Sequence, residues 1–297
     1  MSDVKNTEQA IKKHPEAPVQ EDNRIERFLN SDRVAKVHCP TYGVGLAINS
    51  LSKAQKRSKI LLESLAVVSG IRGTGRVAGN MKVNSFHTTQ GRAIPFAIGL
   101  TVANPKLNTV VLSTEQDLVS IGGNHFINAA RRNINLTVIC VNNFNYPLLS
   151  ERNNPEVQLE TETSGIDSFI TLFNLSFLAE SAGAVYVARW TALHIHQIIT
   201  SISEGLNKNG FSFIEILTPY PELFREKKTS AEDLDRLKIY FEKSRTENGA
   251  DTKQINIESR DEVIVGKFVD LERPTFMEKM NQHYQEIFGE KYTPYTG

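Results

Sequence analysis

The sequence predicts an α/β protein whose core is a doubly wound, mostly parallel sheet, followed by a C-terminal extension. Two observations support this prediction: runs that are apolar at nearly every position, and their regular alternation with amphipathic stretches. From about residue 60 onward, short runs that are apolar at nearly every position alternate with longer amphipathic stretches of helical period. Strands that are apolar on both faces are typical of parallel sheets. A parallel neighbour is reached through a right-handed crossover helix, which explains the alternation.

Five strands and four helices are expected in the sheet region. The predicted strands are residues 64–69, 109–113, 136–141, 185–188 and 211–217. The predicted helices are residues 91–104, 118–132, 166–183 and 191–207. Because ligands of such folds bind at the carboxyl ends of the strands, chemistry is expected in the loops 70–76, 114–117, 142–151 and 218–221.

The composition divides the chain into three parts. Residues 1–30 are polar and unpatterned, which predicts a flexible tail. The predicted α/β domain covers 31–222, and a C-terminal arm and helix cover 223–297. Within that last part, the charged stretch 228–260 is expected to be a surface arm or linker, and an amphipathic helix is expected near 274–288.

Charge and cysteine content limit the partners and the sites. The chain of 297 residues has 34 Lys and Arg against 34 Asp and Glu, so no net charge favours nucleic acid or an anionic membrane. No apolar run reaches the roughly 18–20 residues that cross a bilayer, and the N-terminal segment lacks a secretory signal. We therefore expect a cytoplasmic protein. Its two cysteines, Cys39 and Cys140, are too few for a disulfide framework or a four-cysteine metal site.

The loop after the first predicted strand is rich in glycine and arginine. Its glycines allow backbone N–H groups to approach a phosphate. Arg72 and Arg76 add positive charge. The loop is a candidate phosphate site, and a tight turn with a solvated arginine is the alternative.

Oxygen-bearing side chains follow the next two strands. Glu115 and Asp117 come after one strand, and Asn142 and Asn143 come after the other. Oxygens at the ends of adjacent parallel strands can share an octahedral Mg²⁺. Helix capping by Asp117 and a turn at the two asparagines explain the same residues equally well.

Three other residues carry less information. His87 opens a helix, and a packed or capping role is expected for a lone histidine. Cys140 is expected in the core, and Cys39 is expected to be a buried or loop thiol.

Taken together, these segments resemble the β subunits of 2-oxoacid:ferredoxin oxidoreductases. The similar stretches run in family order over roughly residues 38–275, and they are 39–43, 67–76, 86–95, 121–133, 142–143, 210–215 and 269–274. The resemblance implies a domain of the thiamine-diphosphate-binding type, with thiamine diphosphate and Mg²⁺ as cofactors. It also implies a separate α subunit that completes the site.

The resemblance assigns roles to individual residues. The family's metal motif G-D-G-D aligns with residues 114–117. Implied Mg²⁺ ligands are Glu115, Asn143 and the carbonyl of Asn145, in a site weakened because glutamate is longer than aspartate. Gln90 replaces the histidine of the family's H-G-R and is the implied catalytic residue. The implied cofactor-binding residues are Ile71, Arg72, Gly73, Thr74, Gln116, Asp117, Pro147 and Leu148.

The phosphate cradle departs from the family pattern. Arg72 replaces a glycine, and Pro147 and Leu148 stand in a segment that is G-M-T-G-G-like in the family. Lost glycines remove backbone donors that side chains cannot replace at the same distance. The sequence therefore predicts a weakened site for the diphosphate.

The sequence departs further from the family at the positions of the iron–sulfur ligands. Of four cluster cysteines only Cys39 remains, because Tyr42, Gly73 and Tyr220 stand at the other three positions. One thiolate cannot hold a [4Fe–4S] cluster. The sequence predicts that this chain has no cluster of its own.

Three functions remain open. The first is a subunit of a thiamine-diphosphate enzyme that acts on a small 2-oxoacid without its own cluster, together with an α-subunit-like protein. The second is a non-catalytic paralogue that acts as a scaffold or regulatory subunit, through pairing with an α-subunit-like protein or self-association. The third is a domain rebuilt to bind another nucleotide or phosphorylated ligand.

Overall fold

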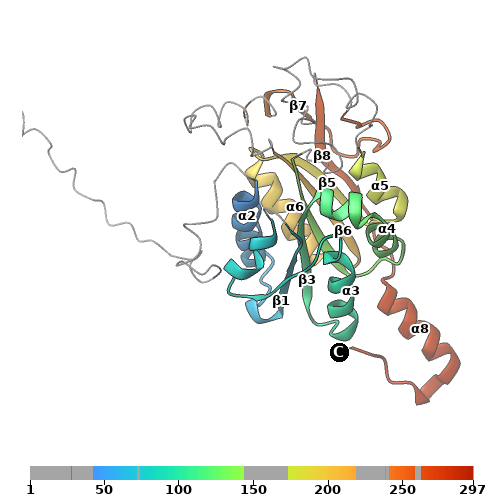
Figure 1. Cartoon of the computed structure of the whole chain (residues 1–297). Coiled ribbons are helices and arrows are strands. Elements are labelled where there is room, and N and C mark those ends of the chain that lie inside the picture. The colour runs from blue at the N-terminus through green and yellow to red at the C-terminus, as the bar shows by residue number, and fades with distance from the viewer. Residues whose placement is uncertain are drawn as a thin grey trace, which may run out of the picture.

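A computed structural model describes residue 28 and residues 43–71, 74–143, 173–218, 238, 241–257 and 262–296. In these residues an eight-stranded sheet carries helices on both faces (Figure 1). This arrangement confirms the predicted α/β class with a mostly parallel sheet. No helix in this part of the chain is both long and apolar enough to cross a membrane.

The strands follow one another across the sheet in the order β2-β1-β3-β4-β6-β5-β8-β7. Their bounds are β1 Leu65–Ser69, β2 Asn84–His87, β3 Asn108–Thr114, β4 Leu136–Asn142, β5 Tyr186–Thr191, β6 Phe211–Leu217, β7 Ser244–Thr246 and β8 Val263–Asp270. Strands β1 to β6 pair in parallel. Strand β8 runs antiparallel to β5, and β7 pairs in parallel with β8. All five predicted strands are present.

The sequence did not predict the edge strand β2. His87, which was expected at the start of a helix, is instead the exposed last residue of this strand, and the helix begins at Ala93. The four residues of β2 are exposed or half-buried, so they show no apolar run. The strand exists because its backbone pairs with β1. Its place at the edge of the sheet explains why apolar side chains are not needed there.

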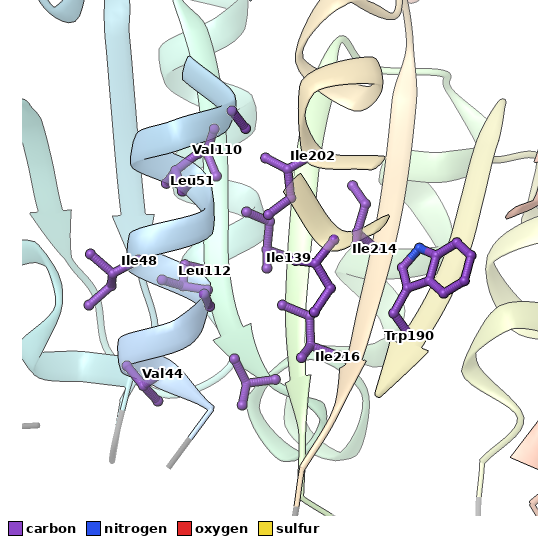
Figure 2. Packing of buried hydrophobic residues seen from close by; sticks show 14 of the residues in the cluster. Val44, Ile48, Leu51, Val110, Leu112, Ile139, Trp190, Ile202, Ile214 and Ile216 are labelled. Carbon is purple, nitrogen blue, oxygen red and sulfur yellow. The ribbon is translucent and has the colours of Figure 1, made fainter. Parts of the chain in front are cut away.

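Helices α2 (Val44–Arg57) and α6 (Ile195–Asn207) cover one face of the sheet. In Figure 2, Leu51 of α2 lies next to Val110 of β3, and Ile202 of α6 lies next to Ile139 of β4. The labelled residues of this cluster are Val44, Ile48, Leu51, Val110, Leu112, Ile139, Trp190, Ile202, Ile214 and Ile216. Burying each aliphatic side chain of this size contributes about 1.5–3 kcal/mol, so this cluster fixes the two helices on the sheet.

Helices α3 (Ala93–Ala103), α4 (Gly123–Arg131) and α5 (Leu175–Ala182) cover the other face. The ring of Phe126 packs edge-on against Phe211 and Phe213, with ring centres 5.4 and 5.3 Å away. The first part of the predicted helix 166–183 lies outside the described residues.

The predicted helix 118–132 is divided into two. A π-helical segment, η5 (Gln116–Ile121), precedes α4, and the two meet at Gly122. A Cβ atom at Gly122 would lie 2.7 Å from the carbonyl oxygen of Asp117. The end of the π-helical turn therefore has room only for glycine at position 122. A helical period in the sequence does not reveal such a close approach.

The C-terminal part contributes to the sheet. The charged stretch 228–260 was expected to be a surface arm or linker, yet its described residues, 238 and 241–257, include the edge strand β7, and β8 lies between β7 and β5. Helix α8 (Phe276–Phe288) begins at Thr275 with a capping box to Glu278. This helix projects from the body of the protein in Figure 1.

The predicted tail 1–30 lies outside the described residues except for Phe28. That side chain is 1% exposed and belongs to the core cluster under α2. Its carbonyl accepts a hydrogen bond from the backbone N–H of Lys82. At this position the chain is therefore packed against the domain.

Candidate functional site

The carboxyl ends of β1 and β3 form a topological switch point. The chain leaves β1 to form β2 on one side and returns to form β3 on the other side. Open α/β sheets bind their ligands in the crevice at such a point. The predicted loops 70–76 and 114–117 both start here.

Asp117 ties three segments together at this edge. Its Oδ1 accepts a hydrogen bond from the backbone N–H of Gly91 at 2.5 Å, and its Oδ2 accepts one from Ser113 Oγ at 2.7 Å. Gly70 passes so close to Oδ2 that a Cβ atom there would collide with the carboxylate. Gly91 has φ 70°, a left-handed conformation that favours glycine. The carboxylate thus holds the turn that carries Gln90 against the ends of β1 and β3.

We expect Asp117→Ala to lower the free energy of unfolding by about 1–3 kcal/mol, because the buried N–H of Gly91 loses its acceptor. Urea unfolding measures this loss. Asp117→Asn is the matched control, since its amide oxygen still accepts from Gly91 and its NH₂ group can donate to Ser113. An alanine variant as stable as the wild type would contradict the role of this carboxylate.

Glu115 and Asn143 meet at the ends of β3 and β4. The backbone N–H of Asn143 lies 3.4 Å from Glu115 Oε2, and the Glu115 side chain is fully buried. Burial, followed by the carboxylates of Glu215 and Glu115, raises the pKa of the Cys140 thiol, so both carboxylates lie near this residue of β4. The structure therefore brings together two predicted metal ligands that offer carboxylate and amide oxygens, the donors that Mg²⁺ prefers.

Gln116 presents a buried donor at the same edge. Its side chain is 2% exposed, and its Nε2 has no hydrogen-bond partner among the described residues. It is the first residue of the π-helical segment η5, and π-helical turns are frequent at functional sites. A buried amide without an acceptor costs about 1–3 kcal/mol, so an anionic oxygen such as that of a phosphate fits this position.

The first loop is partly described. Thr74 is fully buried, and its hydroxyl donates to the carbonyl of Ile71 at 3.0 Å. The ring of His87 lies against Gly75, where a Cβ atom would be 2.9 Å from His87 Cε1. Gln90 is half-buried in the turn before Gly91.

Other predicted site residues fall outside the described part of the chain. They are Arg72, Gly73, Asn145, Pro147 and Leu148, together with the cluster positions Cys39, Tyr42 and Tyr220. Their roles stay predictions.

The sequence reading missed a buried ion pair beside the site. Arg189 on β5 and Glu215 on β6 are both fully buried, with 2.7 Å between Nε and Oε2. Charged residues are almost never buried unless they are paired. An arginine and a glutamate inside otherwise apolar strands were therefore the signal that could have predicted this pair.

The pair belongs to a row of residues that crosses the ends of four strands. Ser113, Cys140, Glu215 and Arg189 stand side by side in the register of β3, β4, β6 and β5. Ser113, at one end of the row, donates a hydrogen bond to Asp117. The row therefore connects Asp117 with the buried ion pair along the carboxyl ends of these strands, which we call the ligand edge.

Several known proteins are similar to this chain in sequence or in fold. Residues 72–216 match the family model for the C-terminal TPP-binding domain of thiamine pyrophosphate enzymes. The 2-oxoglutarate synthase subunit KorB of Methanothermobacter marburgensis is 38% identical over 90% of this chain and 94% of its own length. The same subunit of Methanocaldococcus jannaschii is 36% identical over 89% and 98%.

Two further matches agree with these. Subunit beta of 2-oxoacid:ferredoxin oxidoreductase 2 from Aeropyrum pernix is 36% identical over 62% of this chain and 60% of its own. The fold matches a chain of the 2-oxoglutarate:ferredoxin oxidoreductase from Magnetococcus marinus with a TM-score of 0.72 and 21% identity, over 92% of this chain and 94% of that one. The high coverage of the KorB subunits at more than one-third identity confirms the resemblance seen in the motifs. The chain belongs to the family of 2-oxoacid:ferredoxin oxidoreductase β subunits, and it contains a match to the TPP-binding domain of thiamine pyrophosphate enzymes.

Proposed function

We propose that the chain is the thiamine-diphosphate-binding β-like subunit of an enzyme that oxidises or decarboxylates a small 2-oxoacid. The observation that carries this proposal is the meeting of Glu115 and Asn143 beside Gln116, whose Nε2 finds no acceptor within the described part of the chain. This group offers oxygen ligands for a divalent cation and a donor for a diphosphate oxygen at one edge of the sheet. The names of the relatives, 2-oxoglutarate synthase and 2-oxoacid:ferredoxin oxidoreductase, support a 2-oxoacid substrate.

Each residue has a proposed task. Glu115, Asn143 and the carbonyl of Asn145 hold Mg²⁺, and Gln116 donates to the diphosphate. Gln90 lines the thiazole or substrate side, in a turn whose position Asp117 fixes. Bound thiamine diphosphate supplies the electron sink for carbanion chemistry. The protein's share is to orient the cofactor and to keep these polar groups in place.

We propose that the chain has no iron–sulfur cluster of its own. A [4Fe–4S] cluster takes four thiolates, and the sequence has only Cys39 and Cys140. Cys140 lies fully buried in β4. Electrons or the acyl group then leave through a partner, for which an α-type subunit is the proposed candidate because the relatives are named as subunits.

We expect thiamine diphosphate with Mg²⁺ to stabilise the full-length chain, alone or with a co-expressed α-type partner, by about 2.7 kcal/mol at 100 times the dissociation constant. Denaturant unfolding with and without ligand measures this shift. The control is thiamine diphosphate with EDTA, which removes the divalent cation and should abolish most of the shift.

The competing proposal is a non-catalytic scaffold subunit. The observation that favours it is that departures from the family pattern gather in the loops that the sequence predicts to bind the ligand, at Arg72, Glu115, Pro147 and Leu148. If neither the chain nor its complex with an α-type partner responds to the cofactor and Mg²⁺, the enzymatic proposal fails and the scaffold proposal stands.

A further inference from the structure

The buried pair of Arg189 and Glu215 is connected on both sides. Arg189 Nη1 donates to the carbonyl of Ile255 at 2.7 Å, and Nη2 lies 3.5 Å from Asn174 Oδ1. Asn174 caps helix α5 by accepting from the backbone N–H of Phe177. The guanidinium is therefore held by a helix start and by a segment of the C-terminal part, which leaves it little freedom to move.

Glu215 connects the held guanidinium to the end of β4. Its Oε1 accepts a hydrogen bond of 2.6 Å from Asn142 Nδ2, while its Oε2 accepts from Arg189 and, at 3.4 Å, from Ser176 Oγ. Asn142 is the last residue of β4 and is 1% exposed. The next residue is Asn143, whose backbone N–H faces Glu115.

Stability alone does not explain an ion pair at this place. The neighbours of both residues in β5 and β6 are buried and mostly apolar. Taking two charges out of water is so unfavourable that well-packed apolar residues of similar volume are often as stable or more stable. A charged hydrogen-bonded pair does differ from apolar residues in one respect, because it fixes the direction of the groups bonded to it.

We propose that Glu215, itself held by Arg189, is a positioning residue that fixes the end of β4 at Asn142 and Asn143 and so sets the Mg²⁺ side of the cofactor site. This inference rests on the proposed function. The pair is joined to the end of β4 through the hydrogen bond from Asn142 to Glu215, and neither Arg189 nor Glu215 is one of the proposed metal ligands. Residues that orient metal ligands in this way commonly change metal affinity about 10- to 100-fold when they are replaced.

The test measures Mg²⁺ affinity in the presence of thiamine diphosphate, by isothermal titration calorimetry on the full-length chain or on its complex with an α-type partner if only the complex binds. The main variant is Arg189→Met with Glu215→Leu, which removes both charges together. Its affinity is expected to fall about 10- to 100-fold while cooperative unfolding persists. Asn142→Ala leaves the ion pair intact and is expected to weaken binding to the same extent, and combining the changes should not add a further loss because they act through one link.

The matched control is Val187→Ala. Val187 lies on β5, is fully buried, and belongs to the core cluster on the α3, α4 and α5 face. The substitution should lower the melting temperature. It should leave the Mg²⁺ affinity within about twofold of the wild type, because Val187 takes part in none of these side-chain hydrogen bonds.

The outcomes separate this inference from the proposed function. A wild type that binds, with all variants within about twofold of it, overturns the positioning role and leaves the proposed function intact. An equal loss of affinity in Val187→Ala also overturns it, because general destabilisation would then explain the effect. If the double variant does not fold, Asn142→Ala decides alone. A wild type that binds neither alone nor in the complex overturns both proposals.

Discussion

Arg189→Met alone is expected to lower the free energy of unfolding by about 3–5 kcal/mol, because it leaves the Glu215 carboxylate buried without its cation. Both side chains are fully buried in the pair. The variant also removes the donor to the carbonyl of Ile255. Urea unfolding should show a lower midpoint with an unchanged slope, which indicates lost stability rather than a changed denatured state.

An exposed arginine provides the matched control. Arg245 pairs with Glu247 and Glu262, and its side chain is 52% exposed. Exposed pairs contribute about 0–1 kcal/mol, so Arg245→Met should leave the midpoint nearly unchanged. Equal effects of the two substitutions would mean that Glu215 is not left uncompensated when Arg189 is removed, and this would contradict the importance of the buried pair.

Glu115→Gln is expected to abolish the part of the cofactor's stabilising effect that depends on Mg²⁺. Glutamine has the same shape but lacks the charge that a divalent cation requires from its carboxylate ligand. At 100 times the dissociation constant the wild type should gain about 2.7 kcal/mol, and this gain should disappear in the variant. Unfolding curves with thiamine diphosphate, with and without Mg²⁺, measure the difference.

Glu115→Asp is the control for this experiment, because it keeps the carboxylate. The resemblance places an aspartate at this position of the family, so this variant should keep its dependence on Mg²⁺. A Glu115→Gln protein that still responds fully to Mg²⁺ would show that Glu115 is not a ligand, and the cation would have to be assigned elsewhere.

The strength of local patterns decided how much of the fold could be predicted. The runs 109–113 and 136–141 became β3 and β4 because every residue of these strands from Thr109 to Thr114 and from Leu136 to Asn142 is buried. Strand β2 has no such run, since an edge strand forms through backbone pairing. The π-helical turn at 116–121 depends on a close approach at Gly122 that a helical period does not show.

The candidate site shows the same division. Glu115 and Asn143 were predicted to lie together, since the ends of neighbouring parallel strands meet at one edge, and the structure places them in contact. The predicted cofactor residue Asp117 has both carboxylate oxygens engaged by Gly91 and Ser113. The sequence could not indicate these partners, because Gly91 is 26 positions away and reaches Asp117 only after the sheet has formed.

The sequence by itself determined the fold class, the family and the edge of the sheet that carries the chemistry. These follow from apolar periodicity and from motifs in a fixed order. Both are read from short stretches of the chain, without knowledge of which residues are in contact. Only the tertiary structure decided which polar groups are buried together: Asp117 with Gly91, and Arg189 with Glu215 and Asn142. The physical reason is that a hydrogen bond inside the protein depends on the distance between two groups and on the loss of water around both. Both are properties of the packed chain.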